Sequence, residues 1–183
     1  MKELFFAIWF FLPAGIANVT PIFAAHTPVI NNWNYPIDGF KKLHNIRIFG
    51  DHKTVRGFVT GIILGTLSST LLFVLATKTS IFANFFPSWY FSTNPIILGV
   101  LLSFGALAGD AVKSFSKRRM NIPPGKTWIP FDQIDYIIGA LLMSSIVHIL
   151  TIPLYLTILI VWVGIHVAST FVGYFLHLKD QPL

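Results

Sequence analysis

Eight charged side chains gather in one short segment, Gly109–Tyr136, which lies between two long apolar runs. The chain has 183 residues, with 13 Lys and Arg and 7 Asp and Glu, so this segment holds a large share of its charge. The eight residues are Asp110, Asp132, Asp135, Lys113, Lys117, Arg118, Arg119 and Lys126. Carboxylates bind hard divalent cations and cationic side chains bind phosphate, so this mixture suits chemistry on a nucleotide.

Asp110 stands in the most unusual surroundings, because it directly follows the apolar stretch 101–109. Carboxylates at membrane depth are costly and usually functional. A helix that continues past Asp110 places four polar side chains on one face, at i, i+3, i+4 and i+7: Asp110, Lys113, Ser114 and Lys117. The alternative interpretation is a structural Asp–Lys ion pair at a helix end.

Asp132 and Asp135 lie three residues apart, directly before another apolar run. This spacing puts both carboxylates on one helix face, near the N-terminal end where the helix dipole favours negative charge. Helix capping explains Asp132 well, but it explains a second carboxylate less well. Magnesium sites use one or two carboxylates plus substrate phosphates. Asp110 with Asp132 or Asp135 therefore supplies such a site if their helices pack together.

Two basic segments offer ligands for phosphate groups. Four cations that follow Asp110 can surround a triphosphate: Lys117, Arg118, Arg119 and Lys126. The ordinary enrichment of cations in cytoplasmic loops is the alternative explanation for them. Lys53, Thr54 and Arg56 begin the second apolar run, and a helix N-terminus of this kind suits phosphate. The P-loop pattern GxxxxGKS/T is absent.

The apolar runs predict an all-α polytopic membrane protein that forms one domain, residues 1–183. Hydrophobic residues make up 54% of the chain and charged residues 11%, whereas soluble domains carry about 25% charged residues. A spanning helix needs about 20 mostly apolar residues. Five transmembrane helices are predicted, over residues 4–25, 55–77, 95–112, 134–150 and 153–178. A shorter piece, 81–91, contains Pro87 and is expected at the membrane interface.

The distribution of Lys and Arg predicts the orientation in the cell membrane. Almost all of these cations lie in residues 26–56, in 113–135 and at the C-terminus, and the opposite side has only Lys2 and Lys78. The positive-inside tendency then puts two long loops and the C-terminus in the cytoplasm and the N-terminus outside. The formal net charge of +6 points to anionic headgroups and nucleotide phosphates as partners, and not to nucleic acid. The absence of cysteine excludes disulfides and thiolate metal sites.

Small residues at four-residue intervals predict close helix packing, either within one chain or between two. They form one long stripe and two short ones: Gly57, Gly61, Gly65 and Ser69; Gly99 and Ser103; Gly105 and Gly109. The six histidines show no such order, and packing is a better explanation for them than metal ligation. Neither a Ser-His-Asp arrangement nor an HExxH motif is visible.

Taken in order, these motifs resemble the CTP-dependent cytidylyltransferases of phospholipid synthesis. The signature of that superfamily has Ser and Lys-Arg before Pro-Gly, followed by paired aspartates. The matching residues here are Ser114, Lys117, Arg118, Pro124, Gly125, Asp132 and Asp135, after a leading Gly109-Asp110. The short form with five spans is similar to the CDP-archaeol synthase family across nearly the whole chain. Further matching pieces are Pro13-Ala14, Ala17-Asn18, residues 36–38, 47–51, 53–54 and 56–57, and Leu178-Lys179.

The resemblance implies transfer of CMP from CTP to a membrane lipid phosphate, with release of pyrophosphate. It also implies a Mg²⁺ site made by Asp110 and Asp132, which Asp135 assists. The side chains implied to hold phosphates are Lys53, Thr54, Arg56, Lys117, Arg118 and Lys126, and Ser114 belongs to the same signature. Asn18 lies inside the first run and either reaches the polar pocket or packs as a helix amide. The chemistry of the lipid chains is left open.

Two other functions are compatible with a small, charged membrane protein. CDP-alcohol phosphotransferases also place aspartates at a membrane surface, but their DG-x2-AR motif is missing from this chain. A transporter or channel subunit would place facing polar residues near the bilayer midplane. Here the polar residues collect at one end of the apolar runs, which favours the cytidylyltransferase interpretation.

Overall fold

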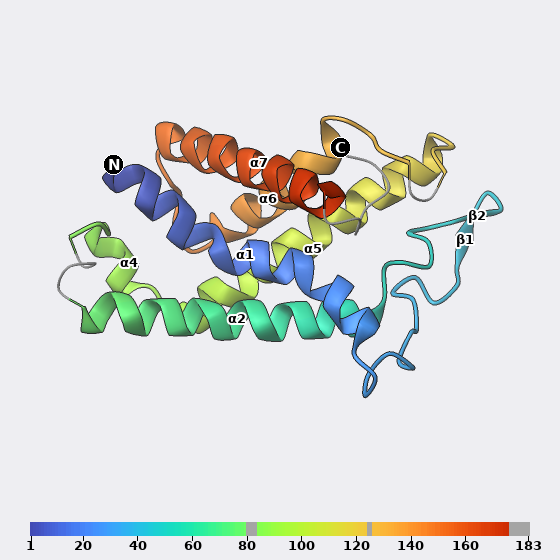
Figure 1. Ribbon diagram of the computed structural model, residues 1–183, viewed down its shortest axis with the longest axis horizontal. Helices are drawn as coiled ribbons and strands as arrows, with labels where there is room; N and C mark the ends of the chain where they lie inside the picture. Colours follow the sequence, from blue (N-terminus) through green and yellow to red (C-terminus); the bar gives the residue numbers. More distant parts are fainter. Residues whose placement is uncertain (80–83, 124–125, 176–183) are drawn as a thin grey trace.

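Four long helices dominate the computed structural model, which describes residues 1–79, 84–123 and 126–175 (Figure 1). They are α1 (Lys2–His26), α2 (Val55–Lys78), α5 (Pro95–Arg119) and α7 (Ile152–Phe175). Each is long and apolar enough to cross a membrane. The smaller elements are α4 (Ser88–Ser92), α6 (Phe131–Ser144) and the antiparallel strands β1 (Lys42–Leu43) and β2 (Ile46–Arg47). The all-helical membrane fold is thus confirmed, with a small hairpin added in a predicted loop.

The fourth predicted span, residues 134–150, contains most of the 14-residue helix α6 (Phe131–Ser144). A helix of this length is about 21 Å long, less than the roughly 30 Å hydrocarbon core of a bilayer. Turns follow, and the His148 ring stacks on Trp89 of α4, with centroids 3.9 Å apart. The segment that begins at α6 therefore ends at the α4 end of the molecule (Figure 1). Five crossings and their orientation stay predictions, and the expected end of the last run, 176–178, lies outside the described residues.

Local sequence signals explain where the helices that carry the charged residues begin. Thr54 is the N-cap of α2, and its Oγ1 accepts a hydrogen bond from the Gly57 N–H. Asn94 caps α5 in the same way, through the Ile96 and Ile97 N–H groups, and Pro95 occupies the first turn. Helix α5 then runs without a break to Arg119, so the polar face predicted for it forms.

Glycines let α1, α2, α5 and α6 approach closely within one chain. A Cβ at Gly61 would lie 2.9 Å from the Ala17 carbonyl oxygen of α1, and one at Gly99 would lie 2.7 Å from Ser69 of α2. A Cβ at Gly105 would overlap the backbone of Gly139 in α6. The predicted packing role of the glycine stripes is therefore confirmed. Their partners are helices of the same chain.

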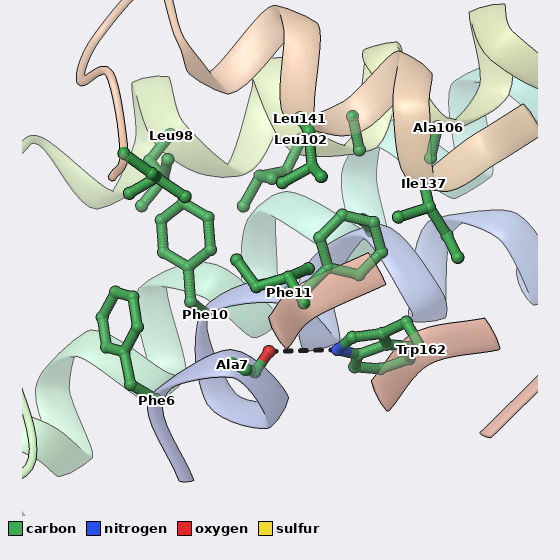
Figure 2. Close-up of a cluster of buried hydrophobic side chains, with 14 of the residues drawn as sticks. Phe6, Ala7, Phe10, Phe11, Leu98, Leu102, Ala106, Ile137, Leu141 and Trp162 are labelled. Carbon is green, nitrogen blue, oxygen red and sulfur yellow. Dashed lines mark hydrogen bonds between the residues drawn. The ribbon is translucent and has the colours of Figure 1, made fainter. Parts of the chain in front are cut away.

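An apolar core joins the long helices. Phe11 of α1, Leu102 of α5 and Ile137 of α6 are fully buried in it, and Figure 2 shows them converging from three elements. The Trp162 indole N–H of α7 donates to the Ala7 carbonyl of α1 at 3.0 Å, which satisfies a buried donor. On the outside of α2, side chains such as Leu71 are exposed, as expected for a surface that faces lipid.

The predicted loop between α1 and α2 is ordered by an aspartate and two arginines. The buried Asp38 carboxylate accepts hydrogen bonds from the Arg47 guanidinium and from the Phe49 and Gly50 N–H groups. Arg119, the last residue of α5, donates to three carbonyl groups of the hairpin, those of residues 43, 46 and 47. The loop is therefore fastened to the end of the helix that carries Asp110.

Candidate functional site

Three carboxylates meet one ammonium group at the polar end of the bundle. Lys113 Nζ lies 3.0 Å from Asp110, 3.1 Å from Asp132 and 2.8 Å from Asp135. Asp110 and Lys113 come from α5, and both other aspartates come from α6. The two helices can approach this closely because residue 109 is a glycine. A Cβ at Gly109 would overlap the backbone of Asp135.

Asp132 has a second group of partners. Both of its carboxylate oxygens lie 3.1 Å from Lys117 Nζ, and the Trp128 N–H donates to it. Burial opposes ionisation of this carboxyl group, but the Trp128 N–H and the Lys113 and Lys117 ammonium groups outweigh it and hold the pKa of Asp132 below its ordinary value. Asp132 is therefore an anion at neutral pH. It is not the N-cap residue, since α6 starts after Pro130.

Lys53 joins this cluster from a distant part of the sequence. Its ammonium group donates to Asp110 Oδ2. Backbone pairing sets its position, because the Ile37 N–H donates to the Lys53 carbonyl at 2.8 Å and the Val55 N–H donates to the Tyr35 carbonyl at 2.9 Å. The loop between α1 and α2 thus closes the site that α5 and α6 form. Three ammonium groups, from Lys53, Lys113 and Lys117, balance the three carboxylates.

A cavity of about 660 Å³ opens beside the cluster. Seven of the residues predicted to act in the site line it: Asn18, Lys53, Thr54, Arg56, Asp110, Asp132 and Asp135. Arg56 is 4% exposed, and its guanidinium donates to the Asn31 carbonyl, so it also fastens the segment after α1. Thr54 combines a place in the cavity wall with its capping bond to Gly57.

The remaining predicted residues lie outside the lining of this cavity. Lys117 reaches the site through Asp132 and also donates to the Lys126 carbonyl. Lys126 is exposed, while Ser114 and Arg118 are half-buried on α5. Pro124 and Gly125, between them in sequence, lie outside the described residues. The roles of Ser114, Arg118 and Lys126 in substrate binding stay predictions.

Besides Lys113, six polar side chains of the cavity wall were not among the predicted site residues: His26, Asn31, Asn34, Asp51, His52 and His166. The first five lie at the end of α1 and in the loop before α2, where spacing in the sequence does not indicate a common direction. His166 is different, because it is an ionisable residue inside the apolar helix α7. The argument that singled out Asp110 at membrane depth applies to it as well.

The donor set at the cluster fits a hard divalent cation. In the described ranges no three acidic or imidazole groups stand ready as metal ligands, because lysine ammonium groups separate the carboxylates. The oxygens of Asp110, Asp132 and Asp135 nevertheless all lie about 3 Å from one cationic nitrogen. Mg²⁺ needs only one or two such carboxylates together with phosphate oxygens. Asp110 and Asp132 each place carboxylate oxygens at the cavity wall.

Fold and site together define a helical intramembrane protein with a carboxylate and lysine site in a polar cavity at one end. A family model described as CarS-like, CDP-archaeol synthase, matches residues 1–183. The CDP-archaeol synthase of Thermococcus gammatolerans is 35% identical and covers 100% of this chain and 98% of its own length. That of Methanocaldococcus jannaschii is 37% identical, over 98% of this chain and 97% of its own. The chain belongs to the CDP-archaeol synthase family.

A solved structure supports the same assignment. It is described as an intramembrane enzyme for archaeal membrane lipids biosynthesis, and it superposes with a TM-score of 0.70 at 29% sequence identity. The match covers 89% of this chain and 91% of the other. The resemblance that the sequence motifs indicated is thereby confirmed.

Proposed function

We propose that this chain transfers CMP from CTP to a membrane lipid phosphate, forming a CDP-activated lipid and pyrophosphate. The relatives named CDP-archaeol synthase favour an archaeal lipid phosphate as acceptor, and we choose di-O-geranylgeranylglycerol phosphate as the acceptor to test. The observation that carries the proposal is the meeting of Asp110, Asp132 and Asp135 at Lys113, beside a polar cavity at the end of a membrane bundle. Such a site brings nucleotide phosphates to the level of lipid headgroups.

The reaction is a direct displacement at the α-phosphorus of CTP. An oxygen of the lipid phosphate attacks this phosphorus, and the bond to the oxygen that bridges the α- and β-phosphates breaks. The bond electrons leave with pyrophosphate. The attacking oxygen is already anionic, so no strong general base is needed, and catalysis depends on positioning and on electrostatics.

Residues of α5, α6 and the α2 N-terminus divide these tasks. Asp110 and Asp132 would hold Mg²⁺, and Asp135 would assist them from the same helix face as Asp132. A bound Mg²⁺ supplies a Lewis acid that neutralises charge on phosphate oxygens. Lys53 and Lys117 each touch one of the carboxylates that would hold Mg²⁺, and this position supports a role of their ammonium groups in binding the phosphates.

The remaining predicted residues would act around this centre. Thr54 and Arg56 present the N-terminus of α2 to the cavity, which suits the nucleotide phosphates. Asn18 would contact the substrate from α1. Ser114, Arg118 and Lys126 would stabilise pyrophosphate from the basic segment after α5, as the signature of the family implies. CTP is a cytoplasmic metabolite, so we place the cavity on the cytoplasmic face of the cell membrane.

The rival functions lack a comparable observation. A transporter or channel subunit needs polar groups across the membrane, but Phe11, Leu102 and Ile137 fill the middle of the bundle. A CDP-alcohol phosphotransferase would use CDP-lipid as a substrate and would release CMP.

An assay with purified protein in lipid vesicles tests the proposal. The protein, CTP, Mg²⁺ and di-O-geranylgeranylglycerol phosphate should release pyrophosphate and form a CDP-lipid in equal amounts. Phosphatidic acid in place of the ether lipid tests the acceptor class, and ATP in place of CTP serves as the nucleotide control. Release of CMP from added CDP-lipid and an alcohol, without use of CTP, would refute the proposal.

A further inference from the structure

The ammonium group of Lys113 occupies the point at which three carboxylates converge. Its Nζ lies between 2.8 and 3.1 Å from an oxygen of each of them: Asp110, Asp132 and Asp135. In the part of the chain that the structure describes, Lys53 and Lys117 each pair with one of these aspartates. Lys113 is therefore the cation that links the carboxylates of α5 to those of α6.

The helices fix the carboxylates and leave the lysine as the movable partner. A Cβ at Gly109 would overlap the backbone of Asp135, and Gly105 and Gly139 also touch backbone to backbone, so α5 and α6 hold the anions close together. Three anions at this distance repel one another, and a cation among them removes this cost. The flexible stem of Lys113 can turn its ammonium group away while α5 stays in place.

A divalent cation would use the same carboxylate oxygens. Mg²⁺ binds such oxygens at about 2.1 Å, and a position within reach of both Asp110 and Asp132 is the one that the Lys113 ammonium group already occupies. Two cations repel each other strongly at so short a distance. Lys113 and Mg²⁺ therefore compete for this position.

We propose that Lys113 is an exchangeable cation. Its ammonium group holds the three carboxylates together until Mg²⁺ replaces it, and then turns into the polar cavity to bind phosphate. The inference rests on the proposed function and gives Lys113 a role in it. Lys113 lines the cavity of about 660 Å³ together with Lys53 and Arg56, so its ammonium group has space to turn and meets the nucleotide phosphates there.

The exchange keeps the charges of the site close to balance. Lys53, Lys113 and Lys117 offset the three carboxylates before the exchange. The two positive charges that Mg²⁺ adds are offset by the phosphates of the nucleotide, which the released ammonium group also contacts. The alternative is a permanent structural ion pair, in which Lys113 keeps its contacts when Mg²⁺ binds.

The reactivity of the Lys113 amine in the wild-type protein distinguishes these two alternatives. An ammonium group that is held in ion pairs reacts slowly with acetic anhydride, because it must first lose its proton. Detergent-solubilised protein is treated briefly with this reagent, either in EDTA or with saturating Mg²⁺ and no nucleotide, and acetylated peptides are quantified by mass spectrometry. The rise of the melting temperature with Mg²⁺ concentration defines saturation.

Labelling of Lys113 should increase at least about tenfold with Mg²⁺, because a state that is populated at or below about 10% becomes the main one. Lys42, which is exposed on β1, is the internal control and should be labelled equally in both conditions.

A variant gives a second measurement. Lys113→Met removes the ammonium group at nearly constant size. In EDTA its melting temperature should lie about 10 °C below that of the wild type, because three buried carboxylates lose a counter-ion. Mg²⁺ meets no competing ammonium group in this variant, so its dissociation constant, measured from the melting temperature against Mg²⁺ concentration, should fall about tenfold. Lys42→Met is the matched control and should change neither value.

Three results would overturn the exchange. They are unchanged labelling of Lys113 at saturating Mg²⁺, the absence of any Mg²⁺ effect on the melting temperature of the wild type, and equal or weaker Mg²⁺ binding by Lys113→Met. If Lys113→Met does not fold, the labelling of the wild type decides alone. The proposed function survives each of these results as long as the wild type forms CDP-lipid from CTP. Absence of CDP-lipid formation by the wild type would instead refute the proposed function.

Discussion

Lys113 forms ion pairs with three carboxylates from two helices, and it thereby holds Asp110 close to Asp132 and Asp135. The sequence spacing placed Asp110 and Lys113 on one helix face, and this part of the prediction is confirmed by the unbroken helix α5. The link to Lys53, which is 57 residues away, was expected only from its basic character and its place before a helix. A local pattern predicts a helix face well. The contact between Lys53 and Asp110 instead depends on backbone hydrogen bonds between residues 35–37 and 53–55, which local spacing does not indicate.

Asp110→Asn should lower CMP transfer at least about 100-fold, because it removes a charged ligand of the proposed metal and a partner of Lys53. The amide is nearly the same size, so the protein should still fold. Pyrophosphate release from CTP is measured in vesicles, with protein amount and melting temperature as checks on folding. The matched control is Glu3→Gln, which changes an exposed carboxylate in the first turn of α1 and should retain full activity. Normal turnover by Asp110→Asn would exclude its role as a metal ligand.

Asp38 should stabilise the loop between α1 and α2 in a pH-dependent way. Burial opposes its ionisation, but the hydrogen bonds from Arg47 and from the Phe49 and Gly50 N–H groups hold the pKa of Asp38 below its ordinary value. A carboxyl group whose pKa is lower in the folded state stabilises that state above its unfolded pKa and loses this effect as the pH falls through its folded pKa.

Asp38→Asn should therefore weaken the loop at pH 7. A loss of about 2 kcal/mol is expected for charged hydrogen bonds, which should speed hydrogen exchange in residues 36–51 about 30-fold. The difference from the wild type should shrink once the pH falls below the ordinary range of aspartate. Asp51→Asn is a suitable control, since Asp51 binds Arg47 from an exposed position with its side chain 79% accessible. Equal exchange rates in wild type and Asp38→Asn at pH 7 would contradict this account.

At the scale of the elements, glycine decides which helices can meet. The apolar runs predicted the bounds of α1 and α2 and the start of α5 closely, because capping and charged residues mark these points in the sequence. Helix α5 continues to Arg119, seven residues beyond the predicted span 95–112. The small-residue stripes also predicted packing, and the structure identifies α1, α5 and α6 as the partners. The length of α6 was predicted less well, since the apolar sequence continues through turns after Ser144.

Gly105→Leu should separate α5 from α6, because even a Cβ there would overlap the backbone of Gly139. We expect the melting temperature of the detergent-solubilised protein to fall by about 10 °C or more, and CMP transfer to fall with it. Gly164→Leu in α7 is the matched control, since a Cβ at that position meets no atom within 4 Å. Similar losses in both variants would show that glycine matters in these helices for a reason other than packing.

At the scale of the whole molecule, the arrangement of charge predicts the orientation in the membrane. Lys42 of the hairpin and Lys78 at the end of α2 are both exposed and lie at opposite ends of the bundle (Figure 1). The chain is free of cysteine, so Lys42→Cys and Lys78→Cys can each be labelled in sealed right-side-out vesicles with a membrane-impermeant maleimide. Lys78→Cys should react from outside and Lys42→Cys only after the vesicles are opened. The reverse pattern would place the polar cavity outside the cell.

The sequence could predict the membrane class, the acidic centre and the family, because these depend on local patterns and on a signature of residues. It could not predict the full wall of the cavity. His166 on α7 and Asn31 after α1 line the same cavity although more than 130 residues separate them. Their meeting depends on how α7 packs against α1 and on how Arg56 fastens the segment after α1, and no pattern along the chain records either fact.

The aromatic residues at the far end of the bundle have a consequence for the cell as a whole. Phe6, Phe86 and Tyr90 pack together there and are almost completely buried. In the part of the chain that the structure describes, this packed apolar cluster lies at the opposite end of the bundle from the polar cavity, and it offers protons and metal ions no charged side chains. We therefore expect that the protein can accumulate in an energised membrane without leakage of ions through the helix bundle.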